Sequence, residues 1–375
     1  MLSIVADENI PRVEEAFSSI GNVHLLDAES ITPEICLRAD VLLVRSVTRV
    51  HEDLLKQSPV AFVGSATAGF DHVDRSYLRE RGIPFVHAPG SNADSVVEYV
   101  LTALLLLHTL RMRTLEGLTL GIVGYGNIGG RLGARAPSFG LQVLKNDPPL
   151  AKAGHPGFVD LETVLTRSDI LTLHVPKSPE TYHLIGDAEL RSMKPGAWVL
   201  NTSRGNVIDN QALKRALKTR KIDAAVLDVW ENEPVPDLEL LEKVTLATPH
   251  IAGHSVDGKL QGTIMLYKAV TQHFQIPGTW NYEQLLQDKL PSPLSLDPEP
   301  ESSWLAALAK QLYDIGADDA RMRKILHVPQ NQIADTFRQL RCNYPPRRAF
   351  DRYTITEIPP PHVQAVRDGL RVGYL

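Results

Sequence analysis

Residues 120–130 read LGIVGYGNIGG, and this stretch decides the fold of the chain. Gly124, Gly126 and Gly129 form the pattern G-x-G-x-x-G between a run typical of a strand and a run typical of a helix. The first glycine permits a tight turn, the second lets a pyrophosphate approach the backbone, and the third lets the helix pack on the strand. The helix then begins with free N–H groups, including those of Asn127 and Ile128, which attract phosphates. The stretch therefore predicts a dinucleotide site.

Apolar runs of strand length recur around the glycine stretch, and helical runs separate most of them. This alternation predicts an α/β fold with a doubly wound parallel sheet. Its six expected strands lie at residues 118–123, 141–146, 170–174, 197–201, 224–228 and 244–247. The first 90 residues alternate in the same way, which predicts a second parallel sheet. Its expected strands lie at 3–6, 41–44, 61–64 and 84–87, and its expected helices at 12–20, 52–57 and 73–81.

An acidic residue indicates which dinucleotide the site accepts. Asp147 lies at the end of the strand that follows the glycine stretch. A carboxylate there accepts hydrogen bonds from the ribose hydroxyls and repels the 2′-phosphate of NADP. Pro148 and Pro149 follow, in place of an arginine that would hold such a phosphate, so NAD is the expected cofactor. The neighbouring Lys145 is a strand residue that we expect to point away.

Composition limits the other classes of function. With a net charge of −5 at pH 7, the chain has no long-range attraction to nucleic acid or to an anionic membrane, so neither is an expected partner. The two cysteines, Cys36 and Cys342, form no metal-ligand spacing or disulfide framework, and no metal is expected. The N-terminus lacks the pattern of a signal peptide, and the apolar run at 96–107 is too short to span a bilayer. We therefore expect a cytoplasmic protein in which that run is a buried helix.

Three later loops carry side chains suited to the oxidation of an alcohol. Arg204, in the motif NTSRG, lies just past a strand end and can hold a carboxylate in a two-pronged contact. His250, in TPHIAG, can take a hydroxyl proton near neutral pH while hydride leaves the substrate carbon. A carboxylate on the other ring nitrogen would fix the tautomer, and LDVWENEP offers two, Glu231 and Glu233. These loops are far apart in the sequence, so only the fold can bring them together.

The motifs TLGIVGYGNIG, NTSRG, VWENEP and TPHIAG, in this order, resemble those of the D-2-hydroxyacid dehydrogenases. The resemblance implies that Arg204 binds the substrate, that His250 is the acid/base and that Glu233 is its carboxylate partner. It also places Asp228 near the nicotinamide carboxamide. Further cofactor contacts are implied at Val175, Thr202, Ser203, Arg204 and Gly253.

The resemblance also implies a domain organisation. A Rossmann-type NAD-binding domain at 93–253 is inserted in a discontinuous, flavodoxin-like substrate domain at 1–92 and 254–280. A small C-terminal α+β domain at 281–375 follows, and the proline-rich stretch at 290–300 is interpreted as a linker. By resemblance the C-terminal domain mediates dimerisation, so the expected partner is a second copy of the chain. Substrate is expected in the cleft between the first two domains.

The segments ADENIP, VRSVT, GSATAGFDHVD and FRQLRCNYPPRR resemble one branch of this family. That branch implies oxidation of 4-phospho-D-erythronate to its 2-oxo acid, in the synthesis of pyridoxal phosphate (vitamin B6). By resemblance, Ser46 and Thr67 contact the substrate, and the backbone N–H groups of 67–69 reach its carboxylate. His254 occupies a position where tyrosine is common, and we retain it as a substrate contact.

The phosphate of this substrate needs basic partners. We hypothesise Arg45 as one, and Arg347 or Arg348 as another, from the same chain or from a second subunit, because arginines cluster in the tail of an otherwise acidic protein. The same cluster also fits a solvated basic face. Two alternatives to the function stay open: a dehydrogenase for another hydroxy acid, such as 3-phosphoglycerate or glyoxylate, and an NAD-sensing binding protein of the same fold.

Overall fold

The computed structural model describes residues 1–287, 290, 292–296 and 300–375, and it comprises two compact units. Unit 1 consists of Met1–Asn92 and His254–Asp288, and unit 2 consists of Ala93–Gly253 and Lys289–Leu375. The tail thus belongs to unit 2, and its separation as a third domain stays a prediction. The linker predicted at 290–300 falls partly outside the described residues.

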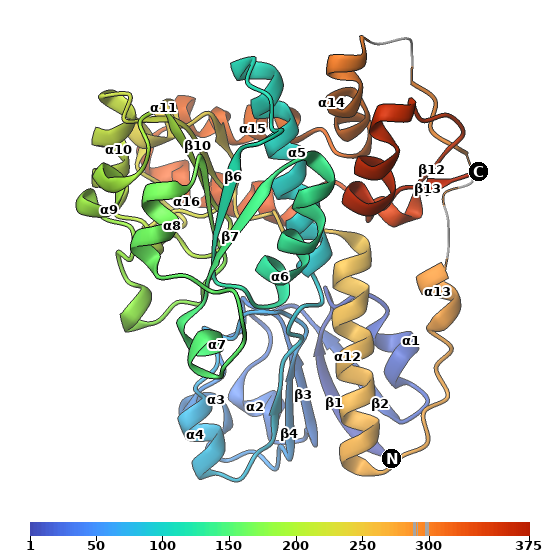
Figure 1. The fold of residues 1–375 in the computed structure, drawn as a ribbon. Coiled ribbons are helices and arrows are strands. Elements are labelled where there is room, and N and C mark those ends of the chain that lie inside the picture. Colours follow the sequence, from blue (N-terminus) through green and yellow to red (C-terminus); the bar gives the residue numbers. More distant parts are fainter. Residues whose placement is uncertain (288–289, 291, 297–299) are drawn as a thin grey trace. The chain divides into compact units, whose positions relative to one another are not determined.

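Unit 1 is built on a five-stranded parallel sheet (Figure 1). Its strands lie in the order β2-β1-β3-β4-β5, which is the flavodoxin-like order. Their bounds are β1 Leu2–Asp7, β2 Gly21–Leu26, β3 Val41–Val44, β4 Phe62–Ser65 and β5 Phe85–Val86. The sequence predicted four of these strands and missed β2.

Side chains alternate between the two faces of this sheet, and helices cover both faces. Leu42 and Val44 of β3 belong to a core that includes residues of α2, α3 and α4. Leu43 belongs to the opposite core, with residues of α1 and α12. The helix α12 therefore covers one face of a sheet whose strands all come from the first 90 residues. The helices are α1 Val13–Phe17, α2 Pro33–Cys36, α3 Glu52–Leu55, α4 Arg75–Glu80, α12 Val256–Phe274 and α13 Glu283–Gln287.

Unit 2 contains the second parallel sheet, in the order β11-β10-β9-β8-β6-β7. Its strands are β6 Thr119–Val123, β7 Gln142–Asn146, β8 Ile170–Leu173, β9 Ala197–Asn201, β10 Ile222–Leu227 and β11 Leu246–Ala247. A single parallel bridge between Lys145 and Phe158 extends the sheet beyond β7. The chain order reverses between β6 and β8, and open α/β sheets bind ligands at such a point. The doubly wound α/β fold predicted from the sequence is confirmed.

Both faces of this sheet are buried, which explains why its strands read as continuous apolar runs. Trp198 of β9 packs in one core with α5 and α6, and Val199 packs in the other with α8 to α11. The helix α5 has the length and composition of a membrane span, but 72% of its apolar window is buried, so it is a core helix. The helices are α5 Ala93–Arg111, α6 Asn127–Arg135, α7 Pro148–Lys152, α8 Leu161–Arg167, α9 Asp187–Ser192, α10 Asn210–Lys218 and α11 Leu238–Lys243.

The tail contributes to both cores of unit 2. Leu308 of α14 and Phe350 join the core of α5, whereas Met322 of α15 and Phe337 of α16 join the opposite one. A short parallel pair of strands gives the tail its β content. The tail elements are α14 Glu301–Leu312, α15 Ile315–Arg323, α16 Ile333–Cys342, β12 Thr354–Ile355 and β13 Gly373–Tyr374.

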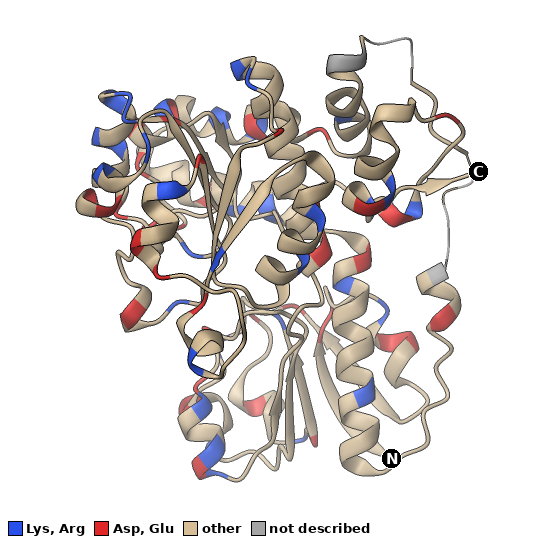
Figure 2. Ribbon diagram, in the orientation of Figure 1, with Lys and Arg blue, Asp and Glu red and all other residues tan. Residues whose placement is uncertain are grey.

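Acidic and basic residues lie together on α9 and α11, and the charged residues of α10 are Lys214, Arg215 and Lys218 (Figure 2). Lys214 pairs with Asp237 and Glu239, and Arg215 pairs with Asp187. The Arg215–Asp187 pair is exposed, and such pairs contribute little to stability, whereas Lys214 and Asp237 are partly buried. Two basic residues of α10 are thus paired with acidic residues of α9 and of the start of α11.

Candidate active site

The glycine turn between β6 and α6 has the geometry that dinucleotide binding requires. Gly124 adopts φ +86°, and a Cβ there would lie 2.6 Å from the carbonyl oxygen of His174. A Cβ on Gly129 would lie 2.0 Å from the carbonyl oxygen of Gly124. A Cβ on Gly126 meets nothing within 4 Å. Two glycines are thus required by packing, whereas Gly126 leaves open the space through which a pyrophosphate would reach the first turn of α6.

Asp147 lies at the end of β7, beside this turn. Its carboxylate accepts hydrogen bonds from the N–H of Tyr125 at 2.8 Å and from the N–H of Leu150 at 3.1 Å. The side chain is half-buried, and its oxygens retain capacity for ribose hydroxyls. The ammonium of Lys145 lies 5.2 Å and 4.6 Å from the ring centroids of Tyr125 and Phe158. These residues fit the adenosine end of NAD.

A partly buried histidine that the sequence did not single out links the next two strands. The ring of His174, just after β8, contacts the hydroxyl of Thr172 at 3.0 Å and that of Thr202 at 3.3 Å. Burial lowers the pKa of His174 to about 3, so the ring stays neutral. The contact joins Thr202, after β9, to His174, and the backbone of His174 and the side chain of Val175 lie against Gly124 of the glycine turn. A lone histidine after a strand carries no sequence pattern that would have revealed this role.

The loop that carries Arg204 is held by its own side chains. Asn201 accepts hydrogen bonds from the N–H and the hydroxyl of Ser203 at 3.0 Å and 2.8 Å, and its amide donates to the carbonyl of Arg204 at 2.9 Å. A Cβ on Gly205 would lie 1.9 Å from the backbone of Trp230. The arginine loop therefore packs directly on the loop that carries the glutamates, and no side chain fits between them.

The structure brings Glu233 and His250 together. The Nδ1 of His250 lies 2.8 Å from Oε2 of Glu233, and Oε1 of Glu233 accepts from the N–H of Trp230 at 2.8 Å. Burial acts to raise the pKa of Glu233, but His250 and these hydrogen bonds lower it overall. The other candidate, Glu231, instead lies 2.6 Å from Nε2 of His183. Residue types alone left both carboxylates open, and Glu233, the one that the family resemblance implied, is the one that contacts His250.

Asp228 organises the loop on which His250 lies. Its carboxylate is 1% exposed and accepts from the N–H groups of Ile251 and Ala252 at 2.7 Å and 2.9 Å, and from the hydroxyl of Thr248 at 2.6 Å. Burial raises the pKa of Asp228. These partners are backbone and side-chain groups of its own neighbourhood, so the predicted proximity of Asp228 to the nicotinamide carboxamide stays a prediction. Gly253 follows this loop directly.

In unit 1 the predicted substrate residues follow the ends of adjacent strands. Arg45 and Ser46 come directly after β3, and Thr67 comes just after β4. The hydroxyl of Thr67 donates to the carbonyl of Gly69 at 2.8 Å. In the described part of the chain, the N–H groups of Ala68 and Gly69 make no hydrogen bond, which suits them to an anion. His254 is half-buried and precedes Ser255, the N-cap of α12.

Arg347 lies elsewhere than the sequence led us to expect. It is 6% exposed, and its guanidinium donates to the carbonyl oxygens of Ser95 and Ala252, inside unit 2. The guanidinium is thus directed at backbone carbonyls of unit 2, and its predicted contact with a substrate phosphate stays a prediction. The tail arginines also have separate environments: Arg338 pairs with Asp335 on the surface, and Arg352 is buried.

The described residues contain no group of three or more His, Cys, Asp or Glu placed to hold a metal ion. Cys36 is buried and Cys342 is exposed, and neither forms a disulfide.

Comparison with known proteins agrees with this geometry. The NAD-binding domain of the D-isomer specific 2-hydroxyacid dehydrogenases matches residues 106–252, and a domain of unknown function, DUF3410, matches residues 285–368. The chain is 48% identical to an erythronate-4-phosphate dehydrogenase of Salinibacter ruber, over 99% of this chain and 98% of that one. It is 44% identical to the enzyme of the same name from Azotobacter vinelandii, over 93% of each.

Solved structures agree on the fold. The D-lactate dehydrogenase of Aquifex aeolicus, complexed with NAD and lactic acid, has a TM-score of 0.62 at 26% identity and covers 73% of this chain and 96% of its own. The 3-phosphoglycerate dehydrogenase of Entamoeba histolytica, with NAD⁺ bound, has a TM-score of 0.64 at 23% identity and covers 75% and 98%. The second likeness concerns the fold alone.

Proposed function

Since the chain belongs to the erythronate-4-phosphate dehydrogenases of the D-isomer specific 2-hydroxyacid dehydrogenase family, we propose that it oxidises 4-phospho-D-erythronate to (R)-3-hydroxy-2-oxo-4-phosphobutanoate with NAD. The observation that carries this proposal is the 2.8 Å contact between His250 and Glu233. An imidazole held by a carboxylate at the strand ends of a nucleotide-binding sheet is the acid/base that alcohol oxidation needs. We further propose that the reaction serves vitamin B6 synthesis in the cytoplasm.

The proposed chemistry assigns one task to each side chain. NAD, when bound, accepts the hydride from C2 of the substrate. His250 directs Nδ1 to Glu233, which leaves Nε2 to take the proton of the C2 hydroxyl. Glu233 remains ionised because its pKa is lowered, and its charge stabilises the imidazolium that forms. Arg204 holds the substrate carboxylate through its guanidinium.

For the remaining predicted residues the proposal follows the likeness to the family. Ser46, Thr67 and His254 contact the substrate, and Arg45 neutralises its phosphate. The open N–H groups of Ala68 and Gly69 support an anion contact after β4. We also propose that the chain forms a homodimer through its tail, which sedimentation velocity at several concentrations would test.

A substrate panel tests the proposed reaction. NADH formation is measured with 4-phospho-D-erythronate, 3-phospho-D-glycerate and glycolate, each with NAD⁺ and with NADP⁺. The expected result is the largest kcat/KM for 4-phospho-D-erythronate with NAD⁺. A larger kcat/KM for another acid would identify that acid as the preferred substrate, and the chain would still be a hydroxyacid dehydrogenase. Binding of NADH without turnover of any acid would instead favour an NAD-sensing protein.

A further inference from the structure

The tail supplies a buried cation to the loop that carries His250. Arg347 lies between α16 and β12, and its Nη2 donates to the carbonyl of Ala252 and to that of Ser95 at 3.3 Å. Its Nε and Nη1 make no hydrogen bond within the described part of the chain. These two carbonyl oxygens are thus its acceptors there. One of them belongs to the His250 loop, and the other belongs to the first turn of α5.

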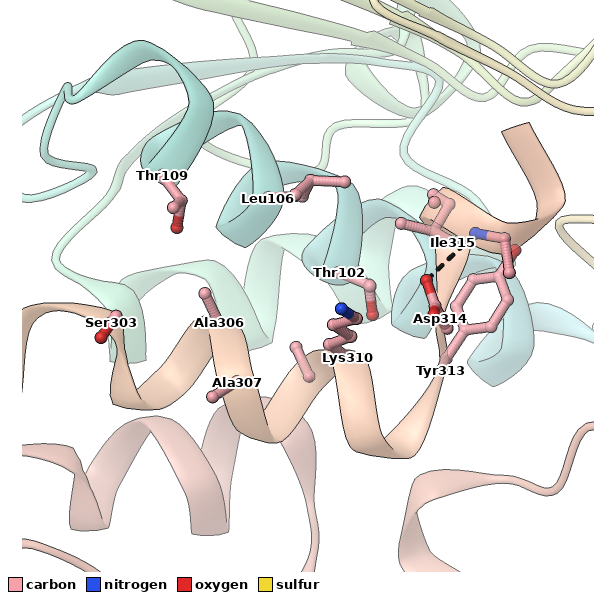
Figure 3. A pocket seen from close by; sticks show the side chains of 13 residues that line it. Thr102, Leu106, Thr109, Ser303, Ala306, Ala307, Lys310, Tyr313, Asp314 and Ile315 are labelled. Carbon is pink, nitrogen blue, oxygen red and sulfur yellow. Dashed lines mark hydrogen bonds between the residues drawn. The ribbon is translucent and has the colours of Figure 1, made fainter. Parts of the chain in front are cut away.

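Aromatic and acidic groups fix the position of this guanidinium. Its Cζ lies 4.4 Å from the ring centroid of Tyr313, whose hydroxyl donates to Asp318 at 2.7 Å. Tyr313 also lines a cavity of about 460 Å³ between α5 and α14, which includes no residue of the glycine turn or of the His250 loop (Figure 3). On the α5 side lies Glu98, and burial raises its pKa to about 8. The two carbonyls, the Tyr313 ring and the nearby Asp318 carboxylate therefore compensate the charge of Arg347 when Glu98 is protonated.

The His250 loop needs such support because its backbone is strained. His250 adopts φ +60°, a left-handed conformation that a residue with a side chain holds only when its surroundings impose it. Asp228 binds the N–H groups on one side, through its own carbonyl to His250 and through its carboxylate to Ile251 and Ala252. Arg347 binds the carbonyl of Ala252, which belongs to the next peptide unit, between Ala252 and Gly253. The loop is therefore held by donors and acceptors alike, and one of the donors comes from the tail.

We propose that Arg347 is a positioning residue for His250. The segment matching DUF3410 thereby supports the active site, because its Arg347 binds the carbonyl of Ala252 in the loop that carries His250. The inference rests on the role of His250 in the proposed function. It assigns to this segment a task that is independent of dimerisation. It also replaces the expectation that Arg347 binds the substrate phosphate.

Hydrogen exchange of the full-length protein provides a test that does not require turnover. In Arg347→Met, the peptide that covers residues 248–253 should exchange about 10-fold faster or more, since a hydrogen bond to a charged group is lost. The peptide that covers the glycine turn should keep its wild-type rate. In turnover assays kcat should fall by about the same factor, while NADH affinity is retained. Arg347→Lys should give a smaller increase in exchange, because an ammonium can reach one carbonyl but cannot stack and bridge as a guanidinium does.

Arg323 provides a matched control. This tail arginine also donates to backbone carbonyls of unit 2, those of Leu241 at 3.0 Å and Val244 at 2.9 Å, but it does not contact the His250 loop. Arg323→Met should lower the melting temperature and leave both kcat and the exchange of 248–253 unchanged. Equal exchange of 248–253 in wild type and Arg347→Met, or equally fast exchange in both Met variants, would overturn the inference. If Arg347→Met does not fold, wild-type exchange in Arg347→Lys overturns it. If the wild-type protein shows no turnover, the proposed function is wrong. The hydrogen-exchange comparison still tests whether Arg347 holds the loop at 248–253, because it does not require turnover.

Discussion

Replacing Glu233 by glutamine removes one acceptor from a site that uses two. Oε1 accepts from the N–H of Trp230 and Oε2 pairs with Nδ1 of His250, both at 2.8 Å. An amide has a single acceptor oxygen, so one contact must be lost. If that oxygen stays with Trp230, the amide donor faces Nδ1 and forces the ring proton onto Nε2, the nitrogen that must accept the substrate proton. If the amide is reversed, two N–H donors meet at Trp230.

The expected magnitude follows from this count. A hydrogen bond to a charged group contributes about 1.5–3 kcal/mol, which corresponds to a fall in kcat of about 10- to 150-fold. The assay is NADH formation at saturating substrate, with NADH affinity measured in parallel and expected to be unchanged. Glu231→Gln is the control, because its carboxylate pairs with His183 instead. Wild-type kcat in Glu233→Gln, or an equal fall in both variants, would refute the assignment of Glu233.

Three further predictions follow from the same geometry. His250→Ala should lower kcat by roughly 10²–10⁴-fold with NADH affinity retained, and near-normal turnover would move the acid/base role to another residue. Gly126→Ala should fold normally but bind NADH less tightly, because its Cβ enters the open space that the pyrophosphate would use. Gly129→Ala should instead lose stability, because its Cβ meets the backbone of Gly124. Thermal melts and NADH titrations compare the two variants, and equal melting temperatures would contradict the packing argument. Glu98 keeps its proton up to about pH 8 when folded, against 4.5 ordinarily, so the folded state binds more protons and wild-type stability should fall as pH rises between these values. Glu98→Gln should remove this decline, which is about 1.4 kcal/mol per pH unit at most. The free energy of unfolding of both proteins is measured with denaturant at pH 5, 6.5 and 8, and an equal pH dependence in the two would contradict the reasoning.

Burial decides which parts of the fold could be predicted. The expected strands at 41–44 and 197–201 coincide with β3 and β9, because both faces of each sheet are covered and the strands read as unbroken apolar runs. The strand β2 escaped prediction because it lies at the edge of its sheet. Asn22, His24 and Leu25 are exposed there, so the apolar pattern is interrupted.

The site shows a similar division. Residue types after strand ends predicted an arginine, a carboxylate and a histidine suited to alcohol oxidation. They did not distinguish Glu231 from Glu233, two positions apart; the family resemblance favoured Glu233, and the contacts with different histidines agree with it. The burial of Arg347 could not be predicted for a related reason. A charged residue in a polar stretch indicates exposure, and its acceptor at Ala252 lies 95 positions away. Packing between such distant segments leaves no local signal.

The two backbone contacts of Asp147 limit how the coenzyme preference of this enzyme could be redesigned. Exchanging Asp147 for alanine would remove the charge that opposes a 2′-phosphate, but it would also release the N–H of Tyr125 in the glycine turn and that of Leu150 in α7. Serine or asparagine keeps an acceptor at this position without the charge. An engineering campaign should therefore begin with those residues, and Lys145 already offers a cation nearby that could be redirected from its aromatic neighbours.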